Sequence, residues 1–248
     1  RFVKVKMIYQ EFKPNYDLAP FLECFWYCEC YMDNWHHKVL PDNCIDILFD
    51  FSDGSSKLKS FVTGMMTKPI ISTRTKILAL RFKPGMAYSF FKMPLSEIID
   101  QSVDLKDLLP QQDYINFIRV FDNEFSPSHL IVIENAISSM LKNISNTDSR
   151  IVAAISNSHL NVEELSASLG VSRQHLRRLF NQYVGLSPKQ YFRVQRVNNL
   201  IRQVSKNASL PGGWAWIAQE CGFTDQSHLI KDFKSISGET PIQYFMGT

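Results

Sequence analysis

The first half of the chain alternates hydrophobic and polar positions with the period of two that is typical of β-strands. In the segment CIDILFDF, Ile45, Ile47 and Phe49 fall on one face of an extended backbone. Asp46 and Asp50 fall on the opposite face. Three more runs are rich in the aromatic and branched residues that favour strands: FWYCECY (25–31), FVTGMM (61–66) and ILALRF (77–82).

Beyond Pro84-Gly85 the pattern becomes helical. Its spacing predicts three helices that pack on or beside the sheet, over residues 95–110, 111–125 and 128–142. The first half is therefore predicted to be a β-rich domain with a helical tail.

Two stretches of the last hundred residues carry the same landmarks in the same order. The first is GVSRQHLRRLFNQYVGLSPKQYF (170–192) and the second is GFTDQSHLIKDFKSISGETPIQYF (222–245). Each follows a short predicted helix and contains a turn glycine and a second helix, which is the pattern of a helix-turn-helix. The first leading helix has an N-cap candidate in Asn161, with Glu164 three residues later.

The repeat shares its buried stripe but has an insertion. Leu176 and Phe180 lie on one helical face in the first unit, as Leu229 and Phe233 do in the second. The turn glycines are 52 positions apart, whereas the two phenylalanines are 53 positions apart. The second unit is therefore predicted to carry one extra residue between its turn and its core.

The faces of the two second helices that point away from the stripe are polar and basic. Arginine and lysine bind guanine edges or phosphates, and glutamine, asparagine, serine and threonine also bond base edges. One such face is typical of any solvated helix, but two of them, each behind a glycine turn, favour DNA binding. The predicted DNA-binding residues are Arg173, Gln174, Arg177, Arg178, Asn181, Thr224, Gln226, Ser227, His228 and Lys231.

A single helix is predicted between the units, starting near Pro188. Seventeen residues from Lys189 to Ser205 would span roughly 25 Å, which is comparable to one turn of DNA once the flanking units are added. We interpret this helix as a spacer that sets the separation of the two DNA-reading helix-turn-helix units.

This tandem arrangement resembles the AraC/XylS family of bacterial transcription regulators over about a hundred residues. The first half also looks like a domain found joined to such modules, through the phrases VLPDNCIDILFDF and VTGMMTKPI. The resemblance implies that Gln174, Arg177, Arg178, Gln226, Ser227 and Lys231 face the groove. The residues that carry it are Gly170, Arg177, Phe180, Gly185, Ser187-Pro188, Tyr191, Ile217-Ala218, CGFTDQSHLIKDFK (221–234) and Gly238–Pro241.

The distribution of charge along the chain supports two domains, a β-rich one followed by an all-α one, and the fold class is α+β. Residues 1–148 hold 16 Lys+Arg and 18 Asp+Glu, and residues 149–248 hold 11 and 6, so the basic surplus lies in the second part. We predict an amino-terminal sensor or dimerisation domain (1–142), a linker (143–149) and an AraC-type DNA-binding domain (150–248). Its helix-turn-helix units are predicted at about 161–183 and 213–236.

The cysteines leave a second interpretation open. Cys24, Cys28, Cys30 and Cys44 lie near His36 and His37 and could form a zinc- or thiol-based sensor or enzyme with DNA binding as its output. Buried core thiols are the more ordinary explanation. Aromatic residues could instead line an effector pocket, for which we name Trp26, Trp35 and Phe90.

The whole pattern predicts a sequence-specific DNA-binding transcription regulator and not an enzyme, with no cofactor and no metal. No apolar run is long enough for a membrane span, the first residues lack a signal-peptide core, and the cysteine count is odd, so we expect a cytoplasmic protein. Double-stranded DNA is the predicted partner. A small-molecule effector, RNA polymerase and a second copy of the chain are further candidates.

Overall fold

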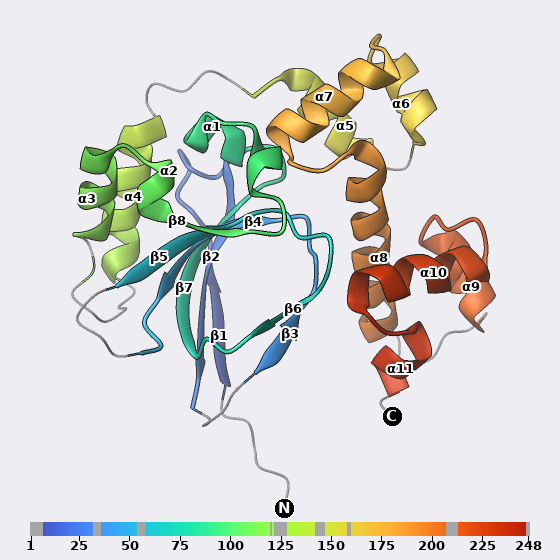
Figure 1. The fold of residues 1–248 in the computed structure, drawn as a ribbon, viewed down its shortest axis with the longest axis horizontal. Helices are drawn as coiled ribbons and strands as arrows, with labels where there is room; N and C mark the ends of the chain where they lie inside the picture. The colour runs from blue at the N-terminus through green and yellow to red at the C-terminus, as the bar shows by residue number, and fades with distance from the viewer. Residues whose placement is uncertain are drawn as a thin grey trace, which may run out of the picture.

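The computed structural model describes residues 7–31, 36–53, 58–119, 121, 128–141, 147–157, 160–206 and 213–246. A β-rich domain with helices on one side stands beside a column of carboxy-terminal helices (Figure 1). This is the predicted α+β architecture. No helix in the described residues is both long and apolar enough to cross a membrane.

The main sheet has six strands in the order β1-β2-β7-β4-β5-β8, and every neighbouring pair is antiparallel. Two short strands, β3 and β6, form a separate antiparallel sheet. The strands are β1 (Met7–Phe12), β2 (Leu22–Cys30), β3 (His37–Val39), β4 (Ile45–Asp50), β5 (Lys59–Thr63), β6 (Ile70–Ser72), β7 (Lys76–Phe82) and β8 (Ser102–Asp104).

Both faces of the sheet are covered. One face carries the main core, in which Phe49 of β4 packs against Phe117 and Phe121 with ring centroids 5.5 and 4.5 Å apart. The covering elements are α1 (Ala87–Phe91), the 3-10 helix η1 (Leu95–Ile98), α2 (Leu105–Leu108), α3 (Gln111–Ile118) and α4 (Ser128–Leu141). On the opposite face, Leu48, Ile77 and Ala79 form a small buried cluster against Trp26.

The helix predicted over residues 95–110 is wrong. The chain forms η1, then the edge strand β8, and only then α2. Asp100 adopts a left-handed conformation with φ of 55°, which ends any helix, and its backbone N–H donates to the carbonyl of Met65. Pairing of β8 with β5 outweighs the local helical pattern.

The carboxy-terminal half consists of helices joined by short turns in its described residues. Its longest helix, α8, runs between the two predicted helix-turn-helix units (Figure 1). The helices are α5 (Ser149–Ser156), α6 (Val162–Ser168), α7 (Arg173–Tyr183), α8 (Pro188–Lys206), α9 (Gly213–Glu220), α10 (Gln226–Ser237) and α11 (Pro241–Met246).

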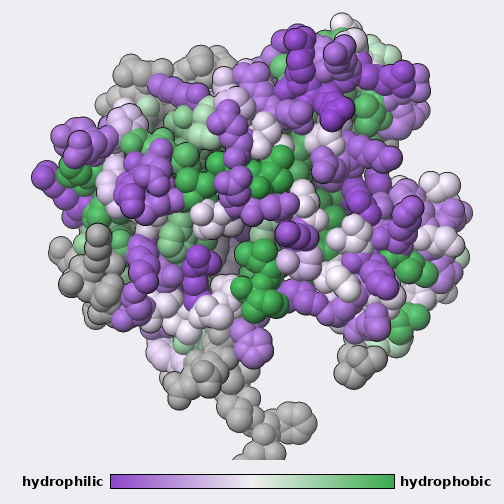
Figure 2. Space-filling view, viewed as in Figure 1, coloured by the Kyte–Doolittle hydropathy of each residue, from purple (hydrophilic) through white to green (hydrophobic). Residues whose placement is uncertain are grey.

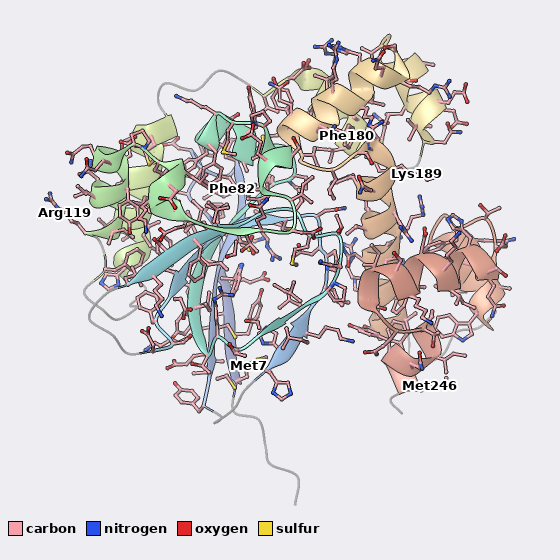
Figure 3. All side chains as sticks on the ribbon, in the orientation of Figure 1. Met7, Phe82, Arg119, Phe180, Lys189 and Met246 are labelled. Carbon is pink, nitrogen blue, oxygen red and sulfur yellow. The ribbon has the colours of Figure 1, made fainter. Side chains whose placement is uncertain are left out.

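The hydrophobic cores do not follow the predicted domain boundary. Buried side chains of α5, α6, α7 and the start of α8 belong to the same cluster as the sheet, so Phe82 and Phe180 lie in one continuous core (Figure 3). A second cluster is formed by α8, α9, α10 and α11, together with Cys221 and Phe223 of the turn between α9 and α10. Residues 143–146 of the predicted linker lie outside the described residues.

Candidate nucleic-acid interface

The first helix-turn-helix unit consists of α6 and α7. The side chain of Asn161 accepts hydrogen bonds from the backbone N–H groups of Glu163 and Glu164, and the backbone N–H of Asn161 donates to the carboxylate of Glu164, which confirms the predicted capping box. Gly170 turns the chain in a left-handed conformation with φ of 64°. Ser172 then caps α7 by accepting from the backbone N–H of His175.

The second unit, α9 and α10, is built with the same devices. Gly222 has φ of 77°, and the N–H of Phe223 donates to the carbonyl of Ala218. Asp225 caps α10 by accepting from the N–H of His228, at 2.8 Å. The two N-caps are 53 positions apart, whereas the turn glycines are 52 apart, so the inserted residue lies between the turn glycine and the cap. This locates the insertion that the repeat predicts.

The predicted DNA-binding side chains lie mainly on the solvent side of α7 and α10. Asn181 and His228 are half-buried, and the other members of the set are exposed. The surface over α7 is almost wholly hydrophilic in the space-filling view (Figure 2). The exposed members are Arg173, Gln174, Arg177, Arg178, Thr224, Gln226, Ser227 and Lys231.

The two histidines that follow the caps make different contacts. In α7 the ring of His175 lies between Arg150 and Arg178, at 3.1 and 3.0 Å from their guanidinium nitrogens. In α10 the Nε2 atom of His228 lies 3.1 Å from a carboxylate oxygen of Asp232, and its Nδ1 accepts from the backbone N–H of Thr224. His228 is therefore held by its own unit as well as lying on the predicted recognition face.

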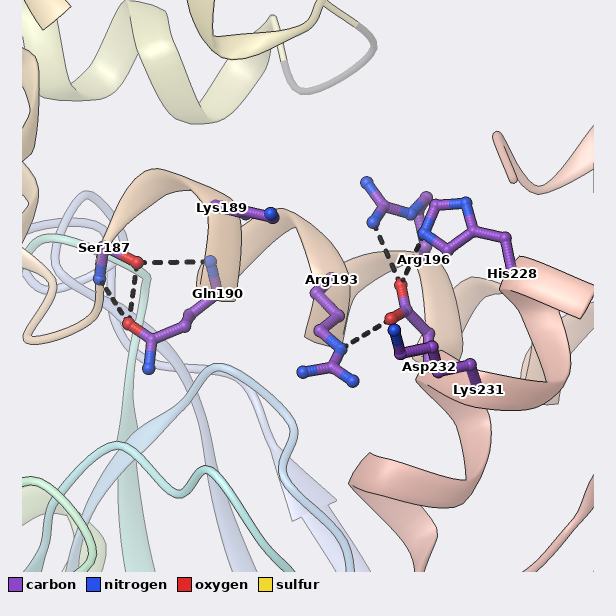
Figure 4. Close-up of a pocket in the computed structure, with 8 residues that line it drawn as sticks. All are labelled: Ser187, Lys189, Gln190, Arg193, Arg196, His228, Lys231 and Asp232. Carbon is purple, nitrogen blue, oxygen red and sulfur yellow. Dashed lines mark hydrogen bonds and ion pairs between the residues drawn. The ribbon is translucent and has the colours of Figure 1, made fainter. Parts of the chain in front are cut away.

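Sequence reasoning missed a cluster between α8 and α10. The buried carboxylate of Asp232 forms an ion pair with the Nε of Arg193 at 2.7 Å and accepts a hydrogen bond from a terminal amino group of Arg196 at 3.2 Å (Figure 4). One signal was available, because Asp232 occupies the repeat position of the buried Leu179, 53 residues earlier. A polar residue in a buried stripe requires partners from another helix.

The amino-terminal domain holds a cavity of about 120 Å³ between the main sheet and the β3–β6 sheet. Trp26 lines it, together with Arg81, whose guanidinium bonds Asp42 and Asp46 at 2.8 and 2.9 Å. Burial, opposed by Arg81, raises the pKa of the Asp42 carboxyl. Phe90 does not line this cavity but packs against Phe82 on the other face of the sheet.

Two of the aromatic residues predicted to line one effector pocket therefore lie on opposite faces of the sheet. Trp26 lies at the cavity and Phe90 in the main core, and Trp35 lies outside the described residues.

Cys24, Cys28 and Cys44 lack the lowered pKa of a reactive thiol. Burial raises the pKa of Cys24 to about 11 and also raises that of Cys28 and Cys44. A reactive cysteine needs the opposite shift. Within the described residues, no three His, Cys, Asp or Glu side chains are grouped closely enough to hold a metal ion.

Two family models match the chain. Residues 165–246 match a helix-turn-helix domain, and residues 10–104 match a domain of unknown function, DUF6597.

Curated relatives match through the carboxy-terminal half. The multiple antibiotic resistance protein MarA of Escherichia coli is 30% identical over 89 residues, which cover 36% of this chain and 68% of MarA. The HTH-type transcriptional regulators ArgR and GbdR of Pseudomonas aeruginosa are each 31% identical over 85 residues, or 33% of this chain. The match spans only 24% of ArgR and 22% of GbdR.

Among solved structures, ToxT from Vibrio cholerae aligns over 98% of both chains with 12% identity and a TM-score of 0.39.

Proposed function

Because this chain belongs to the AraC/XylS family of transcription regulators, we propose that it regulates transcription by sequence-specific binding to double-stranded DNA. The observation that carries the proposal is the duplicated unit with a duplicated exposed face. In each unit a capped helix follows a left-handed glycine and presents polar and cationic side chains to solvent. A helix of this kind fits the major groove of B-DNA.

The proposed mechanism places α7 and α10 in successive major grooves on one side of the duplex. Arg178 of α7 and Lys231 of α10 occupy matching repeat positions, and both are exposed. Each well-placed base contact contributes about 1–3 kcal/mol of discrimination. Ile230 stands where the first unit has Arg177, so the two faces differ and one chain is expected to read a non-palindromic site.

The separation of the two helix-turn-helix units is set by α8. Its 19 residues correspond to about 28 Å at 1.5 Å per residue. Successive major grooves on one face of DNA are about 34 Å apart, and the width of the flanking units supplies the difference. A single helix supports this arrangement better than a loop would, because it fixes distance and angle together.

We also propose that the amino-terminal domain modulates binding, through a small-molecule effector in the cavity beside Trp26. The loop that contributes Asp42 to that cavity also contacts α8. The side chain of Asn43 donates to the backbone carbonyl of Tyr191 at 2.9 Å, and the side chain of Asn198 donates to the carbonyl of Pro41 at 3.0 Å. A ligand that moves this loop would act directly on the spacer helix.

A cytoplasmic location with access to DNA follows from the proposed activity, and RNA polymerase and a second copy of the chain are its candidate protein partners. The alternative of a thiol-based sensor gains no support from Cys24, Cys28 or Cys44, because burial raises the pKa of each thiol. The alternative of a zinc-based sensor gains none from the described residues, among which no three His, Cys, Asp or Glu side chains are grouped closely enough to hold a metal ion.

The test is in-vitro selection of random duplexes by the full chain, followed by binding titrations at fixed salt. We expect a bipartite site with halves about ten base pairs apart. Arg178→Ala and Lys231→Ala should weaken binding to the selected duplex by about tenfold while weakening binding to random DNA less. Lys13→Ala, an exposed lysine of the amino-terminal domain, is the matched control. Enrichment of no sequence would contradict the proposal, and equal losses on both duplexes would reduce the two residues to phosphate contacts.

A further inference from the structure

A cleft of about 320 Å³ separates α8 from α10, beside the predicted recognition face of α10 (Figure 4). Its lining comes from the start of α8, from the middle of that helix and from the face of α10 that is turned toward α8. Lys231 and His228 belong to both the cleft and the predicted recognition face, so the two surfaces are continuous. The lining residues are Ser187, Lys189, Gln190, Arg193, Arg196, His228, Lys231 and Asp232.

The cationic side chains of α8 are aligned along the cleft. Lys189, Arg193 and Arg196 are spaced at i, i+4 and i+7, which places them on one helical face. Lys189 is exposed and extends from the first half of α8 (Figure 3). Lys231 faces this stripe from α10.

The charge of the cleft is strongly unbalanced. Four lining residues carry a positive charge, and Asp232 alone carries a negative one, which leaves a net +3 when His228 is neutral. Two arginines share the single carboxylate, so it cannot neutralise both. A partly closed cleft of this kind attracts an anion.

Asp232 also fixes the orientation of the Arg193 guanidinium group. Arg193 contacts the carboxylate through its Nε at 2.7 Å, and its two terminal amino groups point away from Asp232 (Figure 4). The carboxylate is only 8% exposed, so this contact is better protected from solvent than a surface ion pair. The free edge of a guanidinium held in this way matches the paired oxygens of a phosphate group.

We propose that this cleft binds a phosphodiester group of the DNA backbone between the two major grooves, with Lys189 and Arg193 as direct contacts and Asp232 as a positioning residue. The inference rests on the proposed function, because it requires α7 and α10 to lie in successive grooves. The strand that joins those grooves then passes the spacer helix. Phosphate contacts fix the register of a protein on DNA without reading sequence.

The test measures affinity of the full chain for the selected and the random duplex over a series of salt concentrations. Lys189→Ala and Arg193→Gln should each weaken binding to both duplexes by about threefold to tenfold. Each should also reduce the slope of log affinity against log salt by about 1 and leave the ratio between the duplexes unchanged. Arg202→Gln is the matched control, since Arg202 is an exposed cation of the same helix, nine positions after Arg193 and half a turn away from it.

Asp232→Asn separates positioning from simple charge. This substitution makes the cleft more positive, so electrostatics alone predicts tighter binding to any DNA. A positioning role predicts weaker binding and a lower salt slope, because Arg193 loses its fixed orientation. Unchanged or tighter binding would overturn the positioning role. Circular dichroism shows whether the Asp232→Asn variant is folded. If it is unfolded, Lys189→Ala still tests the cleft, because Lys189 is exposed.

The outcomes distinguish this inference from the proposed function. If the unaltered chain binds no duplex, the proposed function itself fails. If it binds, and both cleft variants keep its affinity and salt slope, only the cleft assignment is overturned. Calorimetric titration with inorganic phosphate covers the other source of the same chemistry. Micromolar phosphate binding that is lost in Lys189→Ala, with DNA affinity unchanged, would make the cleft a small-anion site and contradict DNA contact.

Discussion

The two helix-turn-helix units share their caps and turns but belong to different cores. In the first unit, Phe180 lies in the core that runs on into the amino-terminal sheet. In the second, Phe233 lies in a separate core made by α8, α9, α10, α11 and the turn between α9 and α10. Repetition of local sequence therefore does not imply repetition of tertiary context. The first unit is built as part of the amino-terminal body, whereas the second is attached through α8 and a few polar contacts.

The contrast is clearest where the chain meets the amino-terminal domain. Gly185, after α7, lies so close to η1 that an added Cβ would approach the carbonyl oxygen of Leu95 to 3.0 Å. Gly238, its counterpart after α10, would meet only the ring of Pro69 at 3.7 Å. One unit is packed against the sheet domain, and the other merely touches it. The second unit therefore has the looser contact with the sheet domain at this position.

The largest expected effect is the loss of stability when a buried ring is removed from each core. Phe180→Ala and Phe233→Ala each remove a fully buried ring and should cost about 3–5 kcal/mol. Because the cores are separate, Phe180→Ala should accelerate amide hydrogen exchange in β4 and β7 as well as α7. Phe233→Ala should accelerate it in α9, α10, α11 and the second half of α8, but not in the sheet. Exchange measured by mass spectrometry checks both, and equal acceleration of β7 by the two substitutions would show that the molecule is one cooperative unit.

Local features of both units were predictable from the sequence because short-range chemistry determines them. The capping box at Asn161, the turn glycines and the inserted residue all follow from spacing along the chain. The strands β4 and β7 followed from their apolar runs. The predicted faces of α7 and α10 agree with the observed burial, since the period of 3.6 residues fixes which side chains point inward.

What the sequence could not provide depends on contacts between distant segments. The helix predicted near residue 100 gave way to β8, because an available edge of β5 offered pairing that local periodicity does not register. The pairing of Arg81 with Asp42 and Asp46 requires two strands and a loop to meet. The sequence indicates that Asp232 is a charged residue at a buried position of the repeat. It does not indicate the arginine partners, because these depend on how α8 crosses α10.

A smaller effect compares the two glycines directly. Gly185→Ala and Gly238→Ala both place a side chain at positive φ, 98° and 82°, which costs about 1–2 kcal/mol. Gly185→Ala adds a collision with backbone that cannot rotate away, so its total should be about 2–4 kcal/mol. Chemical denaturation gives both values. Equal costs would indicate that the contact between α7 and η1 yields without loss, contrary to the close packing of the first unit.

The smallest effect concerns the bond that ties the second unit to the β3–β6 sheet. Lys38 of β3 forms an ion pair with Glu239, just after α10, and both side chains are partly exposed. Such a pair contributes less than about 1 kcal/mol, so its loss should barely change stability. If the pair restrains the second unit, however, Lys38→Gln should raise affinity for the selected duplex, by at most about fivefold.

The sign of that change makes the experiment decisive. Lys38→Gln removes a positive charge, and a general electrostatic effect would therefore lower affinity for DNA. Glu239→Gln removes a negative charge and would raise it in either case. Restraint predicts that both substitutions raise affinity and that the double variant gains no more than one of them alone, because the same bond is lost. Lys68→Gln, an exposed lysine near the same sheet, controls for charge. A fall in affinity with Lys38→Gln, matching that control, would mean that the second unit is not held back by this contact and that any restraint must act through α8.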